Sequence, residues 1–544
     1  MKMRTVLAGA VVAALVSLGL TPAARAADPV MVMQLQPVGK TLADVRVIAE
    51  KFGGKAALDK VNEGISEKLG ENGLKGLDLT RPVLGYLVNA TDAENVGGVV
   101  IVPITGEKEF LALLKRAEID AEAVKDAKGL YALEMPEGVN GAEKPIRLRF
   151  VGMNAYVGVN VEDAELATGK LVAPDKVAFP AENALLAVRT YAQRAPKDAA
   201  EKNQEQLKKA AEMIDGLPVP EQFKEAYASI MKLSLRMSEQ IAKEADVSDL
   251  RVNLDPKSYD LVIDTVIKAL PDTTLAKDIA ARKPTTNRFA GMLTPDTVFG
   301  FATKLPLFTP EIRKLVVEGV KAGVKSQEDK VPEPAKAITD AAVAGLLRTV
   351  ESGSFDLAFA LTGPNKDEAY GVNLGVSFED PSAVEKEFRA ALKNLPEGAQ
   401  GFVKLDAAKV GSVGIHTINV GGFVPPNGQK ILGDKAVVAI AFAPKALYVS
   451  VASDAVAQIK LALASKPAAA PVLKVVTNGK RMTDLIELSG QPIPEESAAM
   501  FDKEDKQTTA MAVSVEGGDA LTIRYTIRLT PFFLAGAATT LKAK

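Results

Sequence analysis

The chain has 544 residues, of which 47% are hydrophobic and 25% are charged, and its formal net charge is -2. This composition is typical of folded domains, and the length suffices for a large core. The sequence contains no Cys and one His, which excludes disulfides and nearly excludes classical zinc sites. Because no long basic run is present, we expect no nucleic-acid partner.

The first residues predict a secretory signal peptide over residues 1–26. Lys2 and Arg4 precede an apolar stretch, and Ala24-Arg25-Ala26 supplies the small residues of a cleavage site. The apolar stretch is short for a membrane span, which needs about 20 residues. We therefore expect cleavage after Ala26, a secreted or periplasmic location, and no membrane span in the mature chain.

An internal repeat is the most informative pattern in the sequence. The segment from Asn154 to Asp163 returns between Lys445 and Asp454, with Tyr156 matched to Tyr448. Further along, residues 250–255 match 511–516, and residues 261–267 match 521–527. The repeat predicts two related units built on the same plan.

Each copy also contains a buried strand followed by an amphipathic helix. In the first copy the strand is Val99–Ile104, and Phe110, Leu113 and Leu114 then recur at helical spacing. Its counterpart is Gly371–Phe378, followed by a helix for which Asp380 is a suitable N-cap. We expect these two strands to occupy equivalent places.

Closely spaced strands separated by Gly, Asn and Pro predict antiparallel hairpins. We expect them at 130–135, 146–151 and 156–161 in the first copy, and at 402–405, 413–420, 437–442 and 447–451 in the second. Apolar residues at helical spacing predict helices at 42–51, 56–68, 310–321 and 335–349, and a long one over 223–241. The fold class is therefore α+β. We expect a first unit over 27–285 and a second over 290–544, each a mainly antiparallel sheet with helices packed on one face.

His416 is the only conventional candidate for a catalytic base. It lies in an alternating strand, Val413 to Val420, and the first copy has no equivalent histidine. A metal or a Ser–His–Asp site would need partners that the sequence does not supply. We interpret His416 as a polar residue on a half-exposed sheet face, where His416→Gln would cost about 0.5 kcal/mol or less.

Other motifs give no functional residue. No phosphate-binding loop and no Gly-x-Ser-x-Gly elbow occurs. Residues 421–428 are glycine-rich but contain two prolines, which predicts a long hairpin loop, and the acidic cluster at 502–505 is typical of a solvated surface. The absence of Trp argues against a glycoside hydrolase. We assign no catalytic, cofactor-binding or metal-binding residue, and no cofactor.

The layout resembles uncharacterised secreted bacterial proteins with a duplicated α+β organisation, and this resemblance carries no functional motif. Three classes of function remain open. The first is a non-catalytic exported protein that binds a protein partner or has a structural role, and this is the class we expect. The second is a carrier of an apolar ligand or lipid, which a solvent-open apolar cavity would favour. The third is an enzyme with a dispersed carboxylate or serine site, which a cleft with convergent titratable groups would favour.

Overall fold

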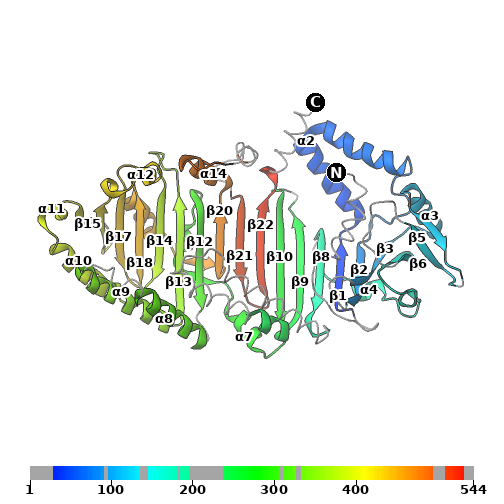
Figure 1. Ribbon diagram of the computed structural model, residues 1–544, viewed down its shortest axis with the longest axis horizontal. Helices are drawn as coiled ribbons and strands as arrows, with labels where there is room; N and C mark the ends of the chain where they lie inside the picture. Colours follow the sequence, from blue (N-terminus) through cyan, green and yellow to red (C-terminus); the bar gives the residue numbers. More distant parts are fainter. Residues whose placement is uncertain are drawn as a thin grey trace. The chain divides into compact units, whose positions relative to one another are not determined.

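The computed structural model describes residues 29–531, except for 91–95, 126, 135–144, 182–183, 195–236, 256, 307–309, 326–332, 494–500 and 502–508. The chain divides into two compact units, and among the described residues unit 1 ends at Leu275 and unit 2 begins at Ala276. Both units are α+β, and every strand ladder named below is antiparallel. Figure 1 shows the elements in colours that follow the sequence.

Unit 1 is built on one antiparallel sheet. Its strands lie in the order β4-β5-β6-β7-β3-β2-β1-β8-β9-β10. Their bounds are β1 (Met31–Leu35), β2 (Val83–Ala90), β3 (Val96–Pro103), β4 (Asp120–Ala123), β5 (Leu130–Glu134), β6 (Ile146–Val151), β7 (Asn154–Val159), β8 (Leu186–Tyr191), β9 (Ala245–Leu254) and β10 (Asp260–Ala269).

Unit 2 is also built on an antiparallel sheet. Its strands lie in the order β15-β16-β17-β18-β14-β13-β12-β20-β21-β22. A separate two-stranded ladder joins β11 (Thr285–Asn287) and β19 (Ala468–Ala470). The bounds of the main strands are β12 (Thr297–Pro306), β13 (Ser354–Thr362), β14 (Gly371–Ser377), β15 (Val403–Val410), β16 (Val413–Asn419), β17 (Val437–Ala443), β18 (Ala446–Ala452), β20 (Leu473–Thr477), β21 (Met511–Glu516) and β22 (Leu521–Arg528).

The two main sheets have the same strand order, element for element, so most ladder positions of one can be matched to positions of the other. For example, Ile101 on β3 lies opposite Tyr156 on β7, and Gly375 on β14 lies opposite Tyr448 on β18. The next connection agrees as well. The backbone N–H of Ile104 donates to the carbonyl of Met153, and that of Phe378 donates to Lys445.

Helices lie on both faces of each sheet, so the expectation that they pack on one face is wrong. In unit 2, Phe388 of α10 contacts Phe442 on one face of β17, while Ile459 of α13 packs with Ala441 on the other face. The physical reason is that β16 to β18 carry apolar side chains on both faces. Figure 1 shows α8, α9 and α10 along one end of the unit 2 strands and α12 and α14 at the opposite end.

The helix bounds follow most of the predicted segments. In unit 1 they are α2 (Val38–Leu69), which is interrupted by non-helical Gly54, α3 (Glu107–Arg116), η1 (Asp163–Leu166), α4 (Pro174–Val177) and η2 (Ala192–Arg194), and α7 (Thr274–Ala281) crosses the unit boundary. In unit 2 they are η3 (Ala290–Met292), α8 (Pro310–Lys325), α9 (Glu333–Glu351), α10 (Pro381–Lys393), α11 (Glu397–Gln400), η5 (Gly421–Phe423), α12 (Pro426–Leu432), α13 (Ala455–Ala464) and α14 (Gly479–Leu488).

Two sequence expectations about helices need comment. The glycine-rich segment 421–428 is expected to be a hairpin loop, but it forms η5 and the first residues of α12. The reason is that Pro426 suits the first turn of a helix. The long helix predicted over 223–241 lies mostly outside the described residues, and only its last part, from Met237, is described as helix.

Candidate functional site

His416 is fully buried on β16, with 0% of its surface exposed. The interpretation that it occupies a half-exposed sheet face is therefore wrong. It points to the face of the sheet that α10 covers, where the rings of Phe388 and Phe442 lie 5.7 and 5.9 Å from the imidazole. Strand alternation alone could not reveal this cover, because α10 comes from a distant part of the sequence.

Both imidazole nitrogens are engaged. The backbone N–H of Asp406 donates to Nδ1 of His416 over 3.1 Å. Because Nδ1 accepts, the neutral ring carries its proton on Nε2, which lies 3.3 Å from Oε1 of Glu385 on α10. Neither nitrogen is free to accept a proton from a substrate, so this geometry suits a buried structural cluster better than a general base.

Arg389 on α10 connects the two carboxylates around His416. Its guanidinium donates to both oxygens of Asp406, over 2.8 and 2.9 Å, and to Glu385 over 2.8 Å. Such bidentate pairs are the stronger class of charged hydrogen bond. Asp406 itself has a positive φ of 51° at an irregularity in the β15–β16 ladder, between Lys404 and Ala408.

The charges set the protonation states of this cluster. Burial, together with the neighbouring Arg389, lowers the pKa of His416 below its ordinary value, and these effects outweigh the carboxylates of Glu385 and Asp406. The hydrogen bonds from Arg389 lower the pKa of Asp406 and hold it ionised. At neutral pH the cluster therefore contains a neutral imidazole beside an ion pair.

Unit 1 carries a related arrangement at the equivalent place. Tyr131 lies opposite Leu148 on β6, as His416 lies opposite Ile440 on β17, and these positions are equivalent in the two sheets. The Tyr131 hydroxyl donates to Glu107 of α3 over 2.9 Å, where His416 meets Glu385 of α10. This hydrogen bond raises the pKa of Tyr131. The sequence alignment did not bring these two residues together.

The aromatic neighbours of the two clusters are also equivalent. In unit 1, Phe150 contacts Tyr131 at 5.7 Å and Phe110 of α3 at 6.0 Å between ring centroids. In unit 2, Phe442 and Phe388 contact each other at 5.7 Å, and both rings contact His416. In each unit, one helix (α3 or α10) thus contacts the sheet through a carboxylate, a hydrogen-bonding ring and two phenylalanines. This recurrence favours a structural role for both clusters.

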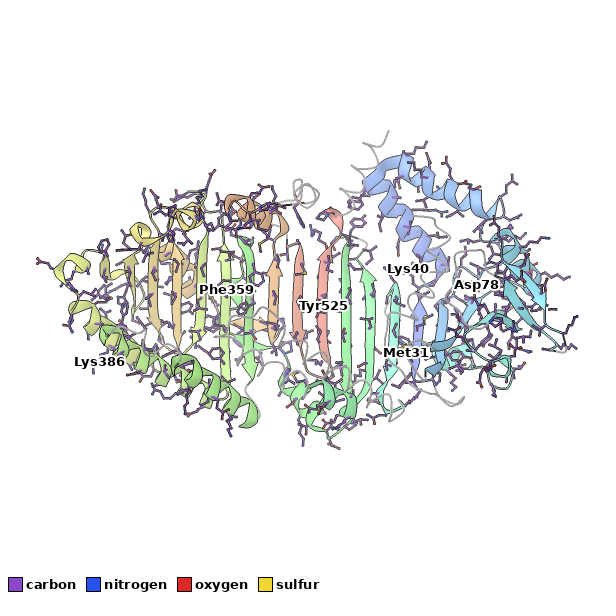
Figure 2. All side chains as sticks on the ribbon, viewed as in Figure 1. Met31, Lys40, Asp78, Phe359, Lys386 and Tyr525 are labelled. Carbon is purple, nitrogen blue, oxygen red and sulfur yellow. The ribbon has the colours of Figure 1, made fainter. Side chains whose placement is uncertain are left out.

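A second feature of unit 2 is a sheet face on which large apolar side chains are incompletely buried. We call it the apolar face. Along β13 the small or polar residues of one face, such as Ala358 and Ala360, are fully buried, whereas Phe359 on the other face is half-buried. Figure 2 labels Phe359 on β13 and Tyr525 on β22. The apolar face consists of Phe299, Phe301, Phe355, Leu357, Phe359, Leu361, Val372, Leu374, Val376, Leu447, Val449, Val451, Leu473 and Val475, and it continues over β21 and β22 through Val513, Ile523 and Tyr525.

The equivalent face of unit 1 is closed. Met33 and Val188 are 4% exposed, whereas their equivalents in unit 2, Phe301 and Val475, are half-buried. The same contrast holds at the other members of this unit 1 core cluster. The remaining equivalent pairs are Met31 and Phe299, Val83 and Leu357, Leu87 and Leu361, and Val100 and Leu374. One sheet plan therefore has this face buried in unit 1 and partly open in unit 2.

A small cavity of about 120 Å³, lined by both polar and apolar residues, lies on the opposite side of the unit 2 sheet. Its lining includes Asn373, whose amide donates to the Thr362 hydroxyl over 3.0 Å, together with Asp454 and Gln458. Gln458 in turn donates to Asp454 over 3.0 Å. These contacts pair polar side chains of the cavity wall with one another.

Within the described residues, no group of three or more His, Asp or Glu side chains is arranged to hold a metal ion. Among the same residues, no helix combines the length and apolar character that crossing a membrane requires. The acidic cluster at 502–505 lies outside the described residues.

Comparisons with protein-family models, with curated proteins and with solved structures found no match to this chain.

Proposed function

We propose that the protein is an exported, non-catalytic binding protein, and that the apolar face of unit 2 holds the hydrocarbon chain of a lipid or fatty acid. The observation that carries this proposal is the inverted burial of the unit 2 sheet. Along β13, β14 and β18 its alanines and glycines are buried while its phenylalanines, leucines and valines are half-buried. Folded proteins normally bury their large apolar side chains, and contiguous exposed ones mark binding surfaces.

The chemistry of the apolar face favours a hydrocarbon over a protein partner. Its members on β12, β13, β14 and β18 are Phe, Leu and Val, which offer no side-chain hydrogen bond. Protein interfaces carry roughly one hydrogen bond per 100–200 Å² and take much of their affinity from Trp, Tyr and Arg. Phe301 and Phe359 stack at 5.9 Å across the strands and offer a flat apolar surface to a flexible chain.

The expected affinity follows from the transfer of methylene groups out of water. Each buried methylene contributes about 0.8 kcal/mol, so the roughly fourteen methylenes of palmitate contribute about 11 kcal/mol before the cost of association. Association and the ordering of the chain remove several kcal/mol of this gain. We therefore expect dissociation constants on the order of micromolar.

The test uses the mature protein and a fatty acid with a dansyl group at its end, whose fluorescence rises in an apolar environment. The wild type should bind it, and unlabelled palmitate should displace it. Phe359→Thr and Phe301→Thr should each weaken binding about tenfold, because each removes one ring of the stacked pair. The matched control is Phe423→Thr, since Phe423 is 70% exposed but lies outside the apolar face.

Two outcomes would contradict the proposal. One is the absence of probe binding by the wild type, and the other is equal binding by the wild type and both variants on the apolar face. A protein partner is the second candidate, favoured by the exposed Tyr525 and Met511 on β22 and β21, at 41% and 42%. This alternative predicts that one protein co-purifies with the wild type and that Tyr525→Thr abolishes this co-purification. It also predicts that the wild type does not bind the probe.

We also infer that the two units arose by duplication of one ancestral unit and that the chain is exported after cleavage at Ala26. Support for the duplication comes from the common strand order and from the equivalent Tyr131 and His416 clusters. A unit 1 fragment and a unit 2 fragment that each fold alone would agree with it, and circular dichroism of both fragments would test this.

A further inference from the structure

We propose that unit 2 contains an acid-sensitive latch, in which protonation of His416 breaks its hydrogen bond with the Asp406 backbone and loosens the edge strand β15 from β16. This inference is independent of the proposed ligand. At this position of the recurring cluster, unit 2 carries His416, which titrates in mildly acidic conditions. Unit 1 carries Tyr131 there, which does not.

The latch is the 3.1 Å hydrogen bond from the Asp406 N–H to Nδ1 of His416. It lies where the regular β15–β16 ladder is interrupted, between Lys404 and Ala408. The imidazole thus supplies an acceptor that the neighbouring strand does not provide there. Asp406 itself has a positive φ of 51°, a backbone conformation that is unfavourable for a non-glycine residue.

Protonation is incompatible with this hydrogen bond. An imidazolium carries a hydrogen on both nitrogens and can only donate. The Nδ1 hydrogen would then face the Asp406 N–H, and a buried donor would lose its acceptor. The segment around Asp406 must move away or take its hydrogen bond from water. Since β15 ends the strand order of the unit 2 sheet, one of its sides has no partner strand among the described residues of that unit.

The charged groups around His416 come from two elements. Glu385 and Arg389 lie on α10, and Asp406 and Lys409 lie on β15. On β17 the nearest side chains, Ile440 and Phe442, carry no charge. Arg389 already binds both carboxylates, so these are partly neutralised before they can stabilise an imidazolium.

The direction of the pH effect follows from these surroundings. The pKa of His416 is lower in the folded protein than the value of about 6.5 in the unfolded chain. The stability that the neutral ring contributes is therefore complete above about pH 6.5 and declines as the pH falls through the lowered pKa. In unit 1 the raised pKa of Tyr131 keeps the phenol protonated across this range, so its cluster should not respond.

The first experiment measures His416 directly in the wild type. Because the chain has a single histidine, ¹⁵N labelling of histidine gives one pair of ring resonances without any assignment. We expect an unprotonated Nδ1 and a protonated Nε2 at neutral pH, with a titration midpoint below about 6.5. A ring protonated on Nδ1 at neutral pH, or a midpoint at or above that value, would overturn the proposal.

The second experiment follows hydrogen exchange of the mature protein at about pH 7.5 and about pH 5, corrected for the intrinsic effect of pH. Protection of residues 403–410 should fall about tenfold at the lower pH, while β5 of unit 1 stays unchanged. His416→Gln supplies a neutral amide that can accept and donate but cannot be protonated. In this variant the fall should disappear.

Retention of the full effect in His416→Gln would assign it to the carboxylates and overturn the proposal, as would unchanged protection in the wild type. If His416→Gln does not fold, Glu385→Gln provides the second variant. It removes the charge that stabilises an imidazolium, so loosening of β15 should then begin at a lower pH than in the wild type. A midpoint of loosening that does not move would also count against the latch.

Discussion

Arg189 and Asp249 form a bidentate ion pair across β8 and β9, with N–O distances of 2.7 and 2.9 Å. The Asp249 side chain is 2% exposed, and Arg251 also donates to it over 2.9 Å. Removal of one partner from a buried pair leaves an uncompensated charge, which typically costs about 3–5 kcal/mol. Unit 1 therefore depends on this carboxylate.

We expect Asp249→Asn to lower the free energy of unfolding of unit 1 by about 3 kcal/mol, measured by urea denaturation. The control is Asp163→Asn, because Asp163 pairs with Arg147 at 2.7 Å but is 48% exposed. That variant should lose less than about 1 kcal/mol. Equal losses in the two variants would contradict the importance of burial.

The same carboxylate predicts a pH dependence. Burial would raise the pKa of Asp249, but the hydrogen bonds from Arg189 and Arg251 outweigh it, and the pKa is lowered. Its contribution to stability is therefore present above the unfolded value of about 3.9 and is lost as the pH falls through the folded value. Asp249→Asn should lack this part of the acid destabilisation of unit 1, and unfolding at a series of pH values would measure it.

Gly414 on β16 leaves space for the Asp406 carboxylate. A Cβ at this position would lie 2.3 Å from Oδ1 of Asp406, which Arg389 holds by two hydrogen bonds. We expect Gly414→Ala to cost about 1–3 kcal/mol, the range for overpacking, in denaturant unfolding. Gly422→Ala is the control, since a Cβ there meets nothing within 4 Å. A loss as large in the control would refute the steric explanation.

Val188 on the closed face of unit 1 and Val475 on the open face of unit 2 are the same residue type at equivalent positions, so they allow the two faces to be compared. Val188 is 4% exposed, and Val475 is half-buried. Val188→Ala should lower the unfolding free energy by about 2 kcal/mol, and Val475→Ala by less than about 1 kcal/mol. Hydrogen exchange of strands β8 and β20 would assign each effect to its unit. A larger loss at Val475 would show that the apolar face is closed in solution.

The proposed export gives a prediction that is independent of the predictions above. Material recovered from the secreted or periplasmic fraction should begin at Ala27, as determined by N-terminal sequencing. The small residues of Ala24-Arg25-Ala26 suit a signal-peptidase site. Recovery of chains that still begin with Met1 would contradict cleavage.

Much of the fold could be predicted because local patterns determine it. The strand from Ile146 to Val151 has the predicted bounds, and Asp380 caps α10 by accepting from the backbone N–H of Ala383. The short strand β4, with the sequence Asp-Ala-Glu-Ala, was missed because these residues have low β propensity. The alignment of β9 with β21 was displaced, since the ladders make Leu250 equivalent to Val513 and the sequence match made it equivalent to Met511.

The candidate sites were harder to predict because they depend on contacts between distant residues. His416 and Glu385 are separated by 31 positions, and only the packing of α10 on the sheet brings them together. Because β4 was not predicted, the repeat did not match Tyr131 to His416. The apolar face was not foreseen either, because alternation tells which residues share a face but not which face is covered.

In each main sheet, the strand that comes first along the chain, β1 or β12, limits the order in which the unit can fold. Met33 on β1 pairs with Gly85 on β2 and with Val188 on β8, so β1 lies between an early and a late part of the chain. Phe301 on β12 has the same position in unit 2, between Phe359 and Val475. Pairings of such long sequence separation form slowly, because a large loop must close first. Each of these strands therefore keeps one side unpaired until β8 or β20 has been synthesised, and until then its free backbone groups are available for pairing with other chains.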